Sequence, residues 1–231
     1  MAPTLASRRP ARRSRECFAA CVAHELRTPL ATQRVLLELA LADPDADVET
    51  WRATARDVLA GCRRQERVLE ACLTLARSLS GLERRELVDL AAVAAAALEA
   101  HDPVGLDCVA ELAPAWTNGN PDLLERLADN LVSNAIRHNV AGGRIEVASG
   151  TEADRAVLSV VNTGPPIPDD DVTRIFLPFQ RLGSSPSSFG DGVGLGLVVV
   201  EAIAEAHAAR VSARARAGGG LAIDVAFPAL D

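Results

Sequence analysis

The sequence predicts an all-α helical hairpin, able to form a four-helix bundle as a dimer, followed by an α+β two-layer sandwich. Helical periodicity runs from residue 14 to residue 79 and is broken once, at Asp43–Asp47, where Pro44 disfavours helix at the residue before it. From Leu87 onward, helical and strand-like patterns alternate in short segments. A chain of 231 residues can bury two modest cores, which suits this division.

The composition is that of a soluble globular protein in a reducing compartment. The net charge of −7 gives no reason to expect nucleic acid as a partner. No run approaches the roughly 20 apolar residues of a membrane helix, and the Arg-rich N-terminus lacks the apolar segment of a signal peptide. The five Cys form no CxxC pair, which argues against a disulfide framework or structural zinc. We therefore expect a cytoplasmic location.

The first predicted helix, from about Ser14 to Ala42, presents a histidine to solvent. Apolar residues recur at every fourth position, namely Phe18, Val22, Leu26 and Leu30. At about 100° per residue, His24 points away from this stripe. Glu25 is adjacent, Thr28 is one turn on, and Pro29 removes a backbone donor and should bend the helix. Cys17 and Cys21 share the face of His24, but free Cys usually acts as a small hydrophobe.

A second predicted helix, from about Val48 to Leu79, completes an antiparallel hairpin. The hairpin exposes an apolar face that it cannot bury alone, whereas two copies would close a four-helix bundle. The hydrophobic pattern therefore predicts a homodimer. Residues 1–14 are interpreted as a solvated basic tail, with a juxtamembrane or linker segment after an upstream sensor region as the alternative.

The second domain is predicted to contain helices near 89–100, 121–139 and 195–209, and strands near 106–112, 144–148, 156–162, 210–216 and 221–227. Asn120 and Pro121 form a strong helix start, with an N-cap amide and Pro at the first helical position. The polar segment 149–154 would join two of the strands, and an Asp within Asp169–Asp171 would cap a short helix.

Two asparagines on the predicted helix 121–139 share one face. Asn130 and Asn134 are four residues apart, so their amides can hold a hard cation such as Mg²⁺ together with phosphates. Taken alone, such a pair is more often a solvated helix face. Arg137 and His138 could extend this face toward a ligand.

Two glycine-containing segments suit a nucleotide. Gly192–Leu197 opens a helix, where glycines and the helix dipole favour an anion, although a lone GxGxG is weak evidence. Asn162 ends a strand before Thr163 and Gly164, and its amide could read an adenine edge; in isolation this is an ordinary turn.

Five segments occur in a characteristic order: His24–Leu30, Asn130–His138, Asn162–Pro168, Ile175–Phe179 and Gly192–Leu197. They resemble the H, N, G1, F and G2 boxes of two-component sensor histidine kinases, of the type found in high-GC bacteria. The resemblance covers essentially the whole chain after about Arg15. It implies a HisKA-type dimerisation and phosphotransfer hairpin at 15–80, a linker at 81–88 and a Bergerat-type GHKL ATP-binding domain at 89–231.

The resemblance also implies roles for individual residues. His24 would attack the γ-phosphate of ATP, Glu25 would hold its Nδ1 hydrogen, and Thr28 would position water against a phosphorylated response regulator. Asn134 with Asn130 would bind Mg²⁺. The implied ATP-binding set is Asn130, Asn134, Arg137, His138, Asn162, Gly164, Phe179, Arg181, Gly192, Gly194, Leu195 and Gly196. The phosphoryl group would pass from His24 to an Asp of the regulator's receiver domain.

Three departures from the family pattern bear on activity. The adenine-reading position usually holds Asp and here holds Asn162, which keeps the acceptor oxygen and loses the charge. Pro166 replaces the second glycine of that box. The loop Leu182–Asp191 contains no Arg or Lys, so Arg181 or Arg137 would have to serve the phosphates.

Two alternative functions were weighed against the histidine kinase. A GHKL ATPase that activates water needs a Glu four residues before the metal-binding Asn, and that position holds Asn130. A degenerate kinase, acting as a nucleotide-binding phosphatase or dimeric scaffold, is suggested by the three departures. The sequence disfavours the first and leaves the second open.

Overall fold

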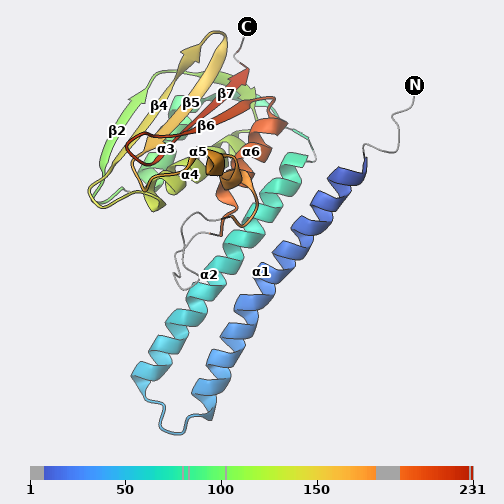
Figure 1. The fold of residues 1–231 in the computed structure, drawn as a ribbon, viewed down its shortest axis with the longest axis vertical. Helices are drawn as coiled ribbons and strands as arrows, with labels where there is room; N and C mark the ends of the chain where they lie inside the picture. Colours follow the sequence, from blue (N-terminus) through green and yellow to red (C-terminus); the bar gives the residue numbers. More distant parts are fainter. Residues whose placement is uncertain are drawn as a thin grey trace. The chain divides into compact units, whose positions relative to one another are not determined.

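The computed structural model describes residues 8–79, 81–82, 84–101, 103–180, 193–228 and 230, with the backbone alone for 8–20. Two long helices come first, α1 (Arg8–Ala42) and α2 (Val48–Leu79). They run antiparallel (Figure 1), with a turn in which Asp47 Oδ1 caps α2 by accepting the Thr50 N–H at 2.8 Å. Helix α1 begins at Arg8, inside the segment predicted as a basic tail, and is continuous through Pro29.

The chain divides into two compact units, Met1–Glu70 and Ala71–Asp231. The second unit contains β1 (Glu86–Asp89), α3 (Leu90–His101), β2 (Asp107–Leu112), β3 (Trp116–Gly119), α4 (Pro121–Arg137), β4 (Arg144–Glu152), β5 (Arg155–Asn162), α5 (Asp169–Val172), a 3₁₀ turn (Arg174–Phe176), α6 (Gly196–Ala206), β6 (Arg210–Ala215) and β7 (Leu221–Pro228). The predicted succession of helices and strands is thereby largely confirmed.

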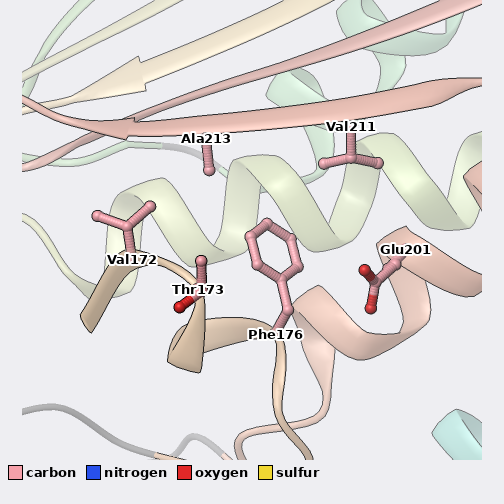
Figure 2. A pocket seen from close by; sticks show the side chains of 6 residues that line it. All are labelled: Val172, Thr173, Phe176, Glu201, Val211 and Ala213. Carbon is pink, nitrogen blue, oxygen red and sulfur yellow. The ribbon is translucent and has the colours of Figure 1, made fainter. Parts of the chain in front are cut away.

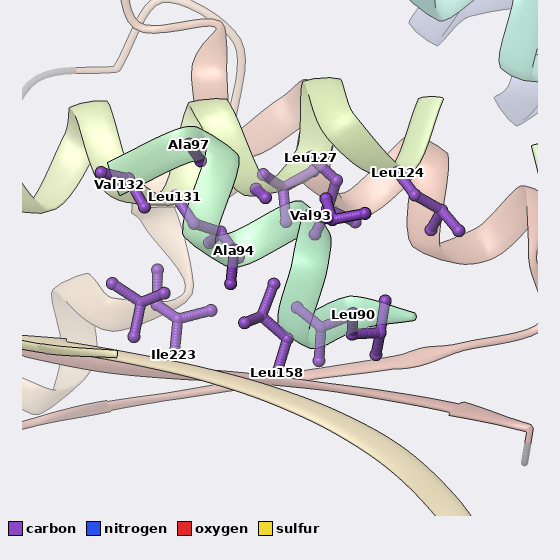
Figure 3. Close-up of a cluster of buried hydrophobic side chains, with 14 of the residues drawn as sticks. Leu90, Val93, Ala94, Ala97, Leu124, Leu127, Leu131, Val132, Leu158 and Ile223 are labelled. Carbon is purple, nitrogen blue, oxygen red and sulfur yellow. The ribbon is translucent and has the colours of Figure 1, made fainter. Parts of the chain in front are cut away.

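Five strands form one sheet in the order β2-β4-β5-β7-β6, in which only the β2–β4 pair is parallel. Helices α3, α4 and α6 supply most of the helical core residues on one face of this sheet. Leu127 and Leu131 of α4 pack with Val93 of α3 above Leu158 and Ile223 of the sheet (Figure 3). The predicted α+β two-layer sandwich is therefore confirmed, and its core lies between the helices and the sheet.

Helix α4 begins as the sequence predicts. The Asn120 side chain accepts a hydrogen bond from the Leu123 N–H at 3.2 Å, and Pro121 occupies the first turn. The short helix α5 does not follow its prediction, because Pro168 is its N-cap and no side chain caps it. Asp169–Asp171 lie in the first turn of the helix instead, where the positive end of the helix dipole stabilises carboxylates.

Two features of the strands differ from the sequence prediction. Strands β4 and β5 extend up to Glu152 and Arg155, so the connection is only Ala153 and Asp154, both with positive φ. Strands β1 and β3 pair with each other, with Leu87 opposite Asn118, and were not foreseen. Four residues are too few to show a period of two, and this pairing is non-local.

A buried histidine ties α6 to the start of α4. His207 is 3% exposed; its Nε2 accepts the Asn120 N–H at 3.0 Å and its Nδ1 donates to the Ile203 carbonyl at 2.7 Å. Both ring nitrogens are thus satisfied only in the neutral form. Burial lowers the pKa of His207; the hydrogen bond to the Ile203 carbonyl opposes this in part, and the positive charge of Arg85 adds a smaller lowering.

We expect His207 to make stability depend on pH. Since its pKa in the folded state lies below the usual 6.5, its contribution is complete above about pH 6.5 and is lost as the pH falls. Urea unfolding of the second unit at pH 7.5 and pH 5.5 measures this loss. His207→Gln should be less stable at pH 7.5 but show a smaller loss between the two pH values. An undiminished loss in that variant would contradict the assignment.

Candidate functional site

His24 lies on α1 with its side chain exposed and without a hydrogen-bond partner among the described residues. The Thr28 hydroxyl, one turn on, donates to the His24 backbone carbonyl at 3.1 Å. The Glu25 carboxylate accepts from Arg64 Nη2 of α2 at 2.8 Å. The structure therefore places Glu25 against Arg64, and its contact with Nδ1 of His24 stays a prediction.

The two asparagines of α4 occupy the half-buried side of a helix whose opposite side is core. Asn130 Nδ2 donates to the Arg126 carbonyl at 2.7 Å, which turns its Oδ1 away from the helix. A Cβ atom added at Gly196 would lie 3.2 Å from this oxygen, so the start of α6 lies directly beside Asn130. The side-chain amide of Asn134 has no hydrogen-bond partner in the described part of the chain.

Asn162 is the last inward-facing residue of β5. Burial alternates along this strand, so Asn162 shares the helix-covered face with Leu158 and Val160, and it is 4% exposed. Its Nδ2 donates to the Thr163 carbonyl at 2.7 Å. The internal hydrogen bond leaves Oδ1 as the acceptor that the side chain can offer to a ligand amine.

The turn after β5 lies against the end of α4. A Cβ atom at Gly164 would lie 2.6 Å from the carbonyl oxygen of His138, the residue that follows α4. On its other side, the Gly220 N–H donates to the Pro165 carbonyl at 3.0 Å. Arg137 and His138 therefore end α4 beside this turn, with the Arg137 side chain exposed and both residues engaged in contacts.

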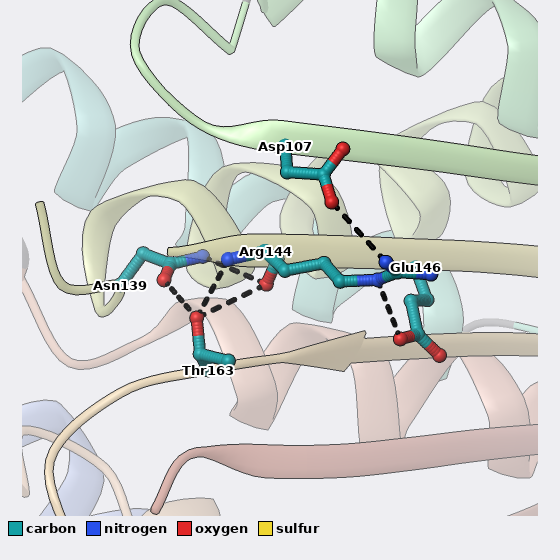
Figure 4. A network of polar contacts seen from close by, with 5 residues as sticks. All are labelled: Asp107, Asn139, Arg144, Glu146 and Thr163. Atoms are coloured by element: carbon teal, nitrogen blue, oxygen red, sulfur yellow. Dashed lines mark hydrogen bonds and ion pairs between the residues drawn. The ribbon is translucent and has the colours of Figure 1, made fainter. Parts of the chain in front are cut away.

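A polar network holds the same turn and was not found by sequence reasoning (Figure 4). The Thr163 hydroxyl donates to Asn139 Oδ1 at 2.6 Å and accepts the Arg144 N–H at 2.7 Å. Asn139 Nδ2 donates to the Arg144 carbonyl at 3.2 Å, and the Arg144 guanidinium pairs with Asp107 and Glu146. The network joins the loop after α4 to the ends of two strands. In the sequence, only Thr163 beside Asn162 indicates that such a network could form.

The segment before α6 is joined to the Phe179 segment by a short backbone contact. The Phe179 N–H donates to the Gly194 carbonyl at 2.9 Å. Gly194 has φ +75°, and a Cβ there would lie 3.0 Å from Phe179 Cα. Leu195 is the N-cap of α6 and no described side chain caps the helix, so its first N–H groups suit an anion. Arg181 and Gly192 lie outside the described residues.

A separate cavity of about 250 Å³ lies between α5, the 3₁₀ turn, α6 and β6 (Figure 2). Its lining contains none of the predicted site residues and consists of Val172, Thr173, Phe176, Glu201, Val211 and Ala213. Burial raises the pKa of Glu201, and the nearby Glu205 raises it further. No group of three or more His, Cys, Asp or Glu suited to a metal occurs among the described residues.

Comparison with protein families matches two models to the chain. The model described as "His Kinase A (phospho-acceptor) domain" matches residues 14–81. The model described as "Histidine kinase-, DNA gyrase B-, and HSP90-like ATPase" matches residues 119–231. The first contains His24, and the second contains every predicted nucleotide-binding residue.

Relatives and solved structures agree with these matches. The chain is 43% identical over 216 residues to Sensor protein CutS of Streptomyces coelicolor. The aligned region covers 91% of this chain and 52% of CutS. It is 34% identical over 181 residues to Sensor protein kinase PmrB of Pseudomonas aeruginosa, spanning 74% of this chain and 37% of PmrB. The fold resembles that of the Acinetobacter baumannii histidine kinase AdeS, with a TM-score of 0.69 at 23% identity, covering 90% and 98% of the two chains.

The chain thus spans about half the length of CutS and less of PmrB. Within the described residues, no helix has the length and apolar character needed to cross a bilayer.

The contact between Gly164 and the end of α4 should control ligand binding. Gly164→Ala would place a methyl 2.6 Å from the His138 carbonyl and displace the turn that carries Asn162. We expect ATP binding, measured by titration with a fluorescent ATP analogue, to weaken on the order of tenfold. Gly150→Ala is the matched control, since nothing lies within 4 Å of its added Cβ. Equal affinity of both variants would show that the turn does not shape the site.

Proposed function

Because the chain belongs to the two-component sensor histidine kinases, with their phospho-acceptor and ATP-binding domains, we propose that it is an ATP-dependent protein histidine kinase phosphorylating itself on His24. The phosphoryl group then passes to an Asp of a response regulator. Thr28 would position water against the phosphorylated regulator, so the protein would also act as a phosphatase of that regulator. A cytoplasmic location goes with this proposal.

The observation that carries the proposal is the convergence of two segments on helix α4. Asn130 lies beside Gly196 at the start of α6, and His138 lies beside Gly164 in the turn after β5. The amide oxygens lie on α4 itself, the uncapped N–H groups lie at the start of α6, and the buried acceptor Asn162 ends the strand before the Gly164 turn. These groups match the phosphates at one end of ATP and the adenine amine at the other.

The pocket supplies positioning groups, and the nucleophile comes from His24. The Nε2 lone pair would attack the γ-phosphorus of ATP. The bond between that phosphorus and the β–γ bridging oxygen would break, and ADP would leave. Glu25 would accept a hydrogen bond from Nδ1–H and stabilise the positive charge that forms on the imidazole. Position 130, where a water-activating Glu would stand, holds an amide that cannot act as a base.

Mg²⁺ fits the amide pair of α4. The Asn130 Oδ1 atom points outward and the Asn134 amide is unpartnered among the described residues, and amide oxygens are hard ligands that suit this ion. Asn134 and Asn130 would hold Mg²⁺ together with phosphate oxygens and waters. When bound, the ion would supply neutralisation of phosphate charge.

A homodimer is the expected working form. A single hairpin leaves large apolar side chains in water, among them Leu30 at 56%, Leu59 at 55% and Leu41 at 74% exposure. A second copy would cover such a surface by closing a four-helix bundle.

The decisive test is transfer of label from γ-³²P-ATP with Mg²⁺. We expect acid-labile, base-stable label on the wild-type chain, as for a phosphoryl group on a histidine nitrogen. His24→Gln should carry no label, because it removes the proposed acceptor nitrogen. Asn134→Ala should also lose label, through weaker nucleotide binding. Nucleotide binding without any label on the wild type would support the nucleotide-binding phosphatase or scaffold instead.

Substitution of the adenine-reading residue gives a second test. Asn162→Asp keeps the acceptor oxygen and restores a charge, so ATP affinity should be retained or increased. Thermal stability should fall slightly, since the hydrogen bond to the Thr163 carbonyl is lost. Asn162→Leu removes the acceptor and should weaken binding in isothermal titration. A collapse of affinity in Asn162→Asp would place the adenine contact elsewhere.

A further inference from the structure

An ion pair crosses the helical hairpin at the residue next to His24. Arg64 Nη2 of α2 donates to Glu25 Oε2 of α1 at 2.8 Å, although the two residues are 39 positions apart. Their side chains are 35% and 27% exposed, so the pair is better shielded from water than the Arg34–Glu38 and Arg56–Glu49 pairs. Among the described residues, no hydrogen bond joins Glu25 to the imidazole of His24.

Neighbouring amides fix the two helices in the register that makes this pair. Gln65, next to Arg64, donates from Nε2 to the Leu26 carbonyl, next to Glu25, at 3.2 Å. Gln33 is buried and donates to the Val58 carbonyl at 3.2 Å. The absence of a side chain at Gly61 permits this approach, since a Cβ there would lie 2.4 Å from Gln33 Nε2. Sliding or rotating one helix would break these bonds together with the ion pair.

The backbone of α1 lacks one hydrogen bond beside the pair. Pro29 has no N–H, so the Glu25 carbonyl lacks the donor that the helix would otherwise supply from that position. A bend of α1 at this point would move Glu25 relative to Arg64.

We propose that Arg64 is a positioning residue that holds the Glu25 carboxylate against α2 and withholds it from His24 in the conformation described. The inference rests on the proposed kinase function, in which Glu25 serves the imidazole. A carboxylate paired with a guanidinium offers less negative charge to a forming imidazolium. The guanidinium does not lose its charge at physiological pH, so Glu25 is released when the ion pair opens and not when Arg64 deprotonates. A shift between α1 and α2 would open the pair, and so would rotation of either side chain.

The first test compares initial rates of autophosphorylation in the full chain. Arg64→Gln should raise kcat roughly two- to fivefold, the range expected for loss of a partly exposed ion pair, with the KM for ATP unchanged. Arg64→Lys keeps a cation and should stay closer to the wild-type rate. Arg63→Gln is the matched control, because Arg63 is the preceding residue of α2, is exposed and has no partner among the described residues.

The second test asks whether the gain passes through Glu25. In a Glu25→Gln background, Arg64→Gln should give no increase, since no carboxylate remains to be released. A rate for Arg64→Gln equal to or below wild type, with unchanged circular dichroism, would overturn the proposal. A gain that persists in the Glu25→Gln background would overturn it equally.

An independent readout separates failure of this inference from failure of the kinase assignment. The ¹⁵N resonances of the His24 imidazole report whether Nδ1–H donates a hydrogen bond, whether or not the chain transfers phosphate. Arg64→Gln should shift the Nδ1 resonance and Arg63→Gln should not. Absence of label on wild-type His24 would count against the proposed function, whereas an unchanged Nδ1 resonance in Arg64→Gln would count against the role of Arg64.

Discussion

The packing of α4 onto the sheet is the constraint on which the candidate nucleotide site depends. Leu124, Leu127 and Leu131 are almost completely buried on one side of this helix. Burial of such side chains is worth about 1.5–3 kcal/mol each, which fixes the rotation of the helix about its axis. Once that rotation is fixed, Asn130 and Asn134 must lie on the half-buried side, toward the start of α6.

Glycines then allow the surrounding backbone to approach α4 from two directions. Gly196 admits α6 beside Asn130, and Gly164 admits the turn after β5 beside His138. The Asn139–Thr163 hydrogen bond and the Arg144 contacts hold that turn in place. The site is therefore built on rigid elements, as positioning of a phosphoryl donor requires.

The hairpin differs from the nucleotide site, because its proposed reactive residue, His24, lies on an exposed surface. His24 is displayed to solvent by the same periodicity that turns Leu26 inward, and α1 and α2 are held in register by the buried Gln33 and the half-buried Gln65. Apolar side chains alone would permit neighbouring registers with similar burial, whereas Gln33 and Gln65 are satisfied in one. This register brings Arg64 to Glu25, which makes the geometry around His24 a property of both helices.

The sequence by itself determined the two-domain fold, the start of α4 at Asn120 and Pro121, the exposure of His24 and the candidate residues of both domains. These features follow from local periodicity, capping and motif order, which need no knowledge of distant contacts. Only the tertiary structure decided the β1–β3 pairing, the Arg64–Glu25 pair and the Asn139–Thr163 network, because each joins residues far apart in the chain. It also decided that Asn162 uses Nδ2 internally and offers Oδ1, a choice made by the nearby Thr163 carbonyl. Local pattern thus specifies which groups exist, and packing decides which of them meet.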